Sequence, residues 1–260
     1  MSGCVGSARN ARELVLEDYP DAKIEVMDSA AATVTEATMV ENAVAIRDAG
    51  CTLDEAVTWL EAEKSTNNIF FTVGNLDYLI KGGRIGKVSG RAANFLGIKP
   101  MILFKDGEIF SGGVARGRQK SFEKALEQLM NYLDVNGGTP DDYRIIVGYG
   151  YDEEEGKRLW MQTRAACVPK YPAAQCEVGL LQIGCTIASI PAPMRWAWVS
   201  CAAGKSSNSR IKKILSHRER IFCVIECYRP SVRCARREKR LSLSFSSSCG
   251  AGAVWVTGLR

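Results

Sequence analysis

The chain has little of what most catalytic and metal-binding sites require. It contains one histidine, His217, and none of its ten cysteines lies in a CxxC pair. We therefore predict no zinc site, no Ser–His–Asp set and no cofactor, and we expect that the protein is not an enzyme. Ten cysteines at irregular spacing resemble a disulfide framework at first, but we favour reduced thiols in a cytoplasmic protein.

Long apolar runs are also absent. No stretch reaches the length of about 18 apolar residues that a transmembrane helix needs, so we expect no membrane span. The first residues, MSGCVGSARNARE, lack the basic region and the apolar core of a secretory signal. Both observations favour a cytoplasmic location.

Acidic residues become scarce toward the end of the chain. Residues 1–189 carry 20 lysines and arginines against 26 aspartates and glutamates, whereas residues 190–260 carry 14 against 3. We interpret residues 190–260 as a basic, Cys/Ser-rich tail that is out of frame and poorly ordered. Taken at face value, such a tail binds nucleic acid weakly through phosphates, because it has no motif for reading bases.

The rest of the chain alternates amphipathic helices with short apolar strands, which predicts an α/β fold. We expect residues 1–73 to be the remnant of a parallel-sheet α/β/α domain and residues 74–189 to form a second α/β domain, followed by an irregular tail. Capping boxes are predicted at Thr33-x-x-Glu36 and Thr52-x-x-Glu55. The residues KDGE at 105–108 predict a hairpin turn, because Asp-Gly tolerates positive φ.

Two glycine-rich stretches and one helix start are candidate anion sites. Gly82 and Gly83 precede Arg84, and Arg116 and Arg118 follow a second glycine pair. These arginines either bind a carboxylate or phosphate or belong to ordinary surface and C-cap structure. Ser2-Gly3 at the start of a predicted helix likewise suits either an anion or an ordinary N-cap.

Five segments of the chain together resemble the central signature of the DegV family. They are residues 77–79 (DYL), 81–87 (KGGRIGK), 96–100 (LGIKP), 106–108 (DGE) and 114–117 (VARG), the last with one residue more than the family's Val-Arg-Gly step. The motifs are dense and ordered, and the resemblance covers about residues 2–189. Members of this family are bacterial fatty-acid-binding proteins.

The resemblance implies a function and a site. It implies that a long-chain fatty acid is enclosed between two α/β domains and that its carboxylate is presented to a separate fatty acid kinase. In the family a Ser-Gly step before a helix holds the carboxylate. We therefore predict that Ser2 and Gly3 bind the fatty acid, and that Arg84 and Arg116 serve the ligand head group or the kinase interface. Nucleic acid is not an expected partner.

Both ends of the chain depart from the family pattern. Family members have an aspartate-containing strand and a Thr-Ser-Gln-Pro segment before the Ser-Gly step, and neither occurs here. The family also continues with His-Thr-Gly where this chain has Ile190 after Ser189. Back-translation of residues 190–198 with one restored base reads His-Thr-Gly-Ala-Asp-Ala-Leu-Gly-Val. We therefore expect an N-terminal truncation and a one-base frameshift, which leaves open an impaired fatty-acid-binding protein and a non-functional gene fragment.

Overall fold

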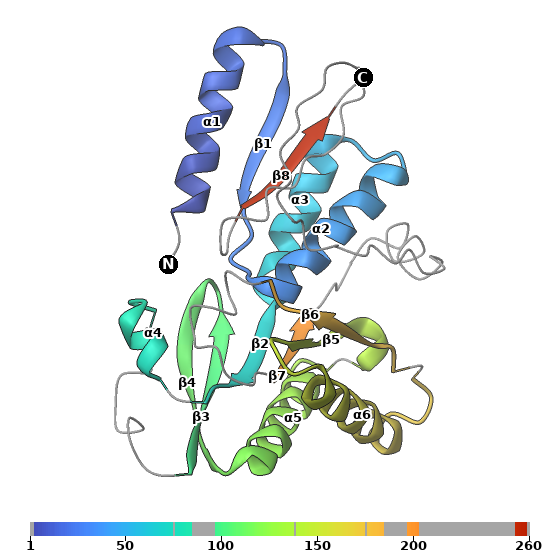
Figure 1. Ribbon diagram of the computed structural model, residues 1–260. Helices are drawn as coiled ribbons and strands as arrows, with labels where there is room; N and C mark the ends of the chain where they lie inside the picture. Colours follow the sequence, from blue (N-terminus) through green and yellow to red (C-terminus); the bar gives the residue numbers. More distant parts are fainter. Residues whose placement is uncertain are drawn as a thin grey trace.

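The computed structural model describes residues 3–74, 76–84, 97–137, 139–174, 176–184, 197–202 and 253–258. In these residues the chain forms two β-sheets with helices packed against them (Figure 1). The predicted α/β class is therefore confirmed.

The first part of the chain forms a small layer around a two-stranded sheet. It consists of α1 (Cys4–Asp18), β1 (Lys23–Asp28), α2 (Thr33–Asp48), α3 (Leu53–Glu63) and the 3-10 turn η1 (Lys64–Thr66). β1 pairs antiparallel with β8 (Ala253–Gly258), so the parallel pairing expected for this part is not what the described strands show. Alternating helices and strands specify the order of elements but not the direction of the partner strand, which here comes from the far end of the chain.

The larger sheet has six strands in the order β4-β3-β2-β7-β5-β6. Their bounds are β2 Asn68–Thr72, β3 Ile98–Lys105, β4 Glu108–Arg116, β5 Arg144–Tyr149, β6 Val178–Gln182 and β7 Ala197–Ala202. Within this sheet only β5 and β6 run parallel. β2 comes from the predicted first domain yet pairs with β3 of the second. The domain boundary at residue 73 therefore stays a prediction.

Two segments of the predicted tail are strands rather than irregular structure. β7 lies between β2 and β5 and pairs antiparallel with both, while β8 pairs with β1. Backbone pairing explains the position of β7, because the facing edges of β2 and β5 would otherwise have unpaired N–H and C=O groups. The remaining residues of the tail lie outside the described part of the chain.

Of the turn and helix caps predicted from the sequence, two are confirmed and one is wrong. The hairpin between β3 and β4 is confirmed, with Asp106 at φ 51° and Gly107 at φ 74°, as a two-residue type I′ turn requires. The Thr52 capping box is also confirmed, since Thr52 Oγ1 accepts from the Glu55 N–H at 3.3 Å and Glu55 Oε2 accepts from the Thr52 N–H at 2.8 Å. The box predicted at Thr33 is wrong, because Thr33 is itself the first helical residue and cannot be the N-cap.

Each face of the six-stranded sheet carries its own core. α5 (Arg118–Val135) and α6 (Glu153–Lys170) cover one face, and Phe70 of β2 packs there with residues such as Leu129 and Leu159. The other face holds a cluster that includes residues at and before α4 (Asp77–Lys81), which we call the α4-side cluster. Its members are Ala32, Ile69, Phe71, Val73, Leu76, Leu79, Ile102, Phe104, Ile109 and Ile183. Strand alternation separates the two cores, because consecutive side chains of β2 point to opposite faces.

Candidate functional site

The start of α1 carries the Ser-Gly step. Ser2 lies outside the described residues. Gly3 is the N-cap of α1, with φ −82° and ψ 0°, and its carbonyl accepts a hydrogen bond from the Ser7 N–H at 3.0 Å. Helix starts leave several N–H groups without intrahelical partners, so this position is suited to an anion. The role of Ser2 and Gly3 in ligand binding remains a prediction.

Arg84 follows the glycine pair that ends α4. The Gly83 N–H donates to the Ile80 carbonyl at 2.9 Å, the Arg84 N–H donates to the Leu79 carbonyl at 2.7 Å, and Gly83 has φ +66°. The glycine pair therefore forms a helix C-cap, one of the two interpretations that the sequence allowed. The Arg84 side chain is exposed and donates only to the carbonyl of Gly82 among the residues that the structure describes.

Arg116 is the last residue of β4 and lies opposite Ile98 at the end of the β3–β4 ladder. The Gly117 N–H donates to the Gly97 carbonyl at 2.8 Å, which closes the ladder just beyond it. Arg116 is exposed. Among the residues that the structure describes, no carboxylate forms an ion pair with it, and its role in anion binding stays a prediction.

Arg118, which the sequence could not distinguish from Arg116, has a structural partner. Its Nε donates to Glu155 Oε1 at 2.8 Å and its Nη2 donates to Glu155 Oε2 at 2.7 Å. Glu155 is buried in the first turn of α6. The idea that Arg118 receives a ligand anion is therefore wrong, because a buried carboxylate already occupies its planar fork.

Lys99 is a residue that sequence reasoning did not assign to the site. Its half-buried side chain donates from Nζ to the Gly74 carbonyl at 3.1 Å. This bond holds the chain leaving β2 against the start of β3, one residue from the position opposite Arg116. Lys99 thus positions the segment that leads into α4 and Arg84. The only signal for it in the sequence was its place in the LGIKP motif.

Arg84 lies three residues after the end of α4, and Arg116 is the last residue of β4; both elements contribute side chains to the α4-side cluster. Leu76 and Leu79, just before Arg84, are buried in this cluster, and β4 contributes Ile109 to it before ending at Arg116. The structure thus attaches two exposed cations to the elements of one apolar core.

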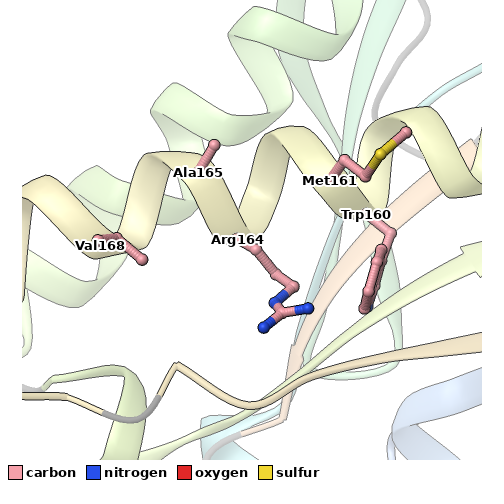
Figure 2. Close-up of a pocket in the computed structure, with 5 residues that line it drawn as sticks. All are labelled: Trp160, Met161, Arg164, Ala165 and Val168. Carbon is pink, nitrogen blue, oxygen red and sulfur yellow. The ribbon is translucent and has the colours of Figure 1, made fainter.

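A separate surface hollow of about 240 Å³ lies on α6 (Figure 2). It is lined by Trp160, Met161, Arg164, Ala165 and Val168, and by none of the four predicted residues. Trp160 Nε1 donates to the Val178 carbonyl at 2.6 Å, and the Arg164 guanidinium lies 4.8 Å from the centre of the Trp160 ring. The hydrogen bond from Trp160 attaches α6 to the strand β6, while the contact with Arg164 lies within α6.

Metal-binding clusters and membrane-spanning helices are both absent from the described residues. No group of three or more His, Cys, Asp or Glu side chains there could hold a metal ion. Among the helices of that same part of the chain, none is long and apolar enough to cross a membrane.

Comparison with known proteins places this α/β chain in a class of bacterial proteins. A family model described as "Uncharacterised protein, DegV family" matches residues 1–190. The chain belongs to the DegV family. The resemblance drawn from the motifs, over about residues 2–189, is therefore confirmed.

Curated relatives carry the same family name. A DegV domain-containing protein of Clostridium perfringens is 33% identical over 184 residues, which are 70% of this chain and 60% of that protein. One of Streptococcus pyogenes serotype M1 is 34% identical over 160 residues, or 61% of this chain and 54% of the relative. The chain thus spans little more than half the length of these relatives.

Two solved structures show similar folds. A fat acid (stearic acid)-binding protein from Eubacterium ventriosum is 39% identical, with a TM-score of 0.68 over 78% of this chain and 67% of the other. The Streptococcus pneumoniae Fatty Acid Kinase (Fak) B3 protein loaded with linoleic acid is 25% identical, with a TM-score of 0.63 over 78% and 68% of the two chains.

Proposed function

We propose that this chain binds a long-chain fatty acid and presents the carboxylate to a separate fatty acid kinase. The observation that carries the proposal is the likeness, at 39% identity, to a protein described as binding stearic acid. The likeness to a fatty acid kinase B3 protein that holds linoleic acid supports a kinase as partner. On this proposal the chain binds the fatty acid and presents its carboxylate, and the kinase carries out the phosphorylation.

The arrangement around the α4-side cluster supports the same ligand class. An acyl chain gains about 0.8 kcal/mol for each methylene that it buries, so it needs an extended apolar surface. The α4-side cluster is an apolar interior with side chains from β2, β3, β4 and α4, and in this proposal the acyl chain lies beside it. In this proposal Arg84 and Arg116 face the carboxylate or the kinase, and Ser2 and Gly3 add donors at the start of α1.

A titration with a fluorescent long-chain fatty acid tests the proposal. Loss of one charge-assisted hydrogen bond, worth about 1.5–3 kcal/mol, should weaken binding by about tenfold to a hundredfold in Arg84→Ala or Arg116→Ala. Arg158→Ala is the matched control, because Arg158 is an exposed arginine on α6, away from these elements. No binding by the wild-type chain, or equal losses in all three variants, would overturn the proposal.

The same variants separate the two roles assigned to the arginines. A variant with normal fatty-acid affinity but slower phosphorylation of the bound acid by the kinase belongs to the kinase interface. A variant that loses affinity and phosphorylation together belongs to the head-group site. Mass spectrometry of lipid extracted from the purified wild-type chain identifies the acyl chain that the protein selects.

A further inference from the structure

A carboxyl group is buried where α3 packs against α2. Glu63, the last residue of α3, is only 4% exposed. Its Oε1 accepts a hydrogen bond from Asn42 Nδ2 of α2 at 2.6 Å, whereas its Oε2 is buried with no hydrogen-bond partner. A buried ionised carboxylate normally has partners for both oxygens, so this geometry is suited to a neutral acid.

Burial is the main influence on the protonation of this group. Desolvation raises the pKa of Glu63 to about 8, although the hydrogen bond from Asn42 and the charge of Arg144 both act in the opposite direction. The side chain therefore keeps its proton at neutral pH and loses it in mildly alkaline solution.

The charged neighbours of Glu63 are few and mostly paired. From β5, Arg144 forms an ion pair with Glu41 of α2, and both side chains are about half exposed. From η1, Lys64 pairs with Glu61. β1 also packs on α3, but its charged side chains are exposed, and β8 contains no ionisable residue. Arg144 is thus the cation whose partner can change when Glu63 becomes charged.

The end of α3 is also connected to the six-stranded sheet and its helices. Thr66 Oγ1 donates to the Glu63 carbonyl at 2.6 Å, and the hydroxyl of Tyr132 in α5 donates to the Thr66 carbonyl at 3.2 Å. The Arg144–Glu41 pair joins β5 to α2 at the same junction. A change at Glu63 therefore acts on the contact between the α2–α3 layer and the large sheet.

We propose that this junction is a proton-controlled latch. When Glu63 is neutral, it stays buried against Asn42 while Arg144 pairs with Glu41. When Glu63 loses its proton, Arg144 leaves Glu41 for Glu63, and the end of α3 with η1 moves away from α2 toward solvent. The latch is a property of the fold and does not depend on which ligand the protein binds.

Hydrogen exchange of the full chain, measured between about pH 6 and about pH 9, tests the latch. After correction for intrinsic exchange rates, protection of the peptide covering residues 60–68 should fall by up to about tenfold per pH unit as the pH rises to about 8, and should level off above it. The Glu63→Gln variant, which cannot ionise, should keep its protection throughout. Peptides within α6 serve as the internal reference, because α6 packs on the large sheet and α5, and they should show no such change.

Two further variants sharpen the test. Glu61→Gln, an exposed acid two residues away, should behave as wild type. Glu41→Gln releases Arg144, so opening should occur at lower pH than in wild type. Equal protection profiles in wild type and Glu63→Gln would overturn the latch, as would an unchanged midpoint in Glu41→Gln. Carbon NMR titration of the Glu63 carboxyl gives an independent reading, and a midpoint near the ordinary value of about 4.5 would also refute it.

Discussion

Arg118 at the start of α5 and Glu155 at the start of α6 form a bidentate ion pair, with N–O distances of 2.8 and 2.7 Å. Glu155 is 3% exposed and Arg118 is 24% exposed at the side chain. The Arg118 guanidinium also lies 4.7 Å from the centre of the Phe122 ring, which belongs to the core of that sheet face. The pair joins the beginnings of two helices that cover the same face.

We expect Glu155→Ala to destabilise the protein strongly. Removing one partner of a buried pair leaves Arg118 without its counter-charge, which should lower the free energy of unfolding by about 3–5 kcal/mol. Glu154→Gln is the control, because Glu154 is adjacent but 74% exposed and should change stability by less than about 1 kcal/mol. Urea unfolding measures both, and equal effects would show that the buried pair has no special role.

Two helical glycines should respond oppositely to alanine. At Gly156 in α6, an added Cβ would lie 2.7 Å from Tyr149 Cβ, whereas at Gly6 in α1 it would meet nothing within 4 Å. Gly6→Ala should stabilise the protein by about 0.5–1 kcal/mol through helix propensity. Gly156→Ala should destabilise it by about 1–3 kcal/mol, because β5 or α6 must shift. Thermal unfolding measures whether each variant raises or lowers stability. Stabilisation by both variants would contradict the close packing at Tyr149.

Glu63 should impose a pH dependence on global stability. Its folded pKa of about 8 lies above the ordinary value of 4.5, so the folded state holds the proton more tightly. The associated stability is fully present below about pH 4.5 and is lost as pH rises to about 8, where the loss levels off. Glu63→Gln should remove this fall from a series of urea unfolding curves. A parallel decline in both proteins over that range would assign the pH dependence to other groups.

Trp160→Phe should weaken the attachment of β6. The substitution removes the indole donor to the Val178 carbonyl, a bond of 2.6 Å, but keeps an aromatic ring for Arg164 to cover. We expect a loss of about 1 kcal/mol in unfolding free energy and faster exchange of the β6 amides. Arg164→Met is the comparison, because it removes the cation and leaves the hydrogen bond. It should leave β6 exchange unchanged, and faster exchange in that variant alone would assign the attachment to Arg164.

The features that the sequence predicted well depend on residues close together in the chain. The Asp106–Gly107 turn follows from the ability of those two residues to adopt positive φ, and the helix beginning after Thr52 follows from a capping box three residues long. The family followed from motifs that keep their order and spacing, and the family comparison confirms it. None of these inferences required knowledge of which distant segments meet.

Only the tertiary structure decided which distant partners these residues have. It paired β1 with β8 and placed β7 between β2 and β5, although no local pattern specifies a strand's neighbour or its direction. It separated Arg118 from Arg116, two similar side chains in one motif, because only Arg118 reaches Glu155 on another helix. It also buried Glu63, and this burial raises the pKa of its carboxyl group. Propensity and capping act over a few residues, whereas pairing, burial and charge depend on contacts between segments that the chain brings together only when it folds.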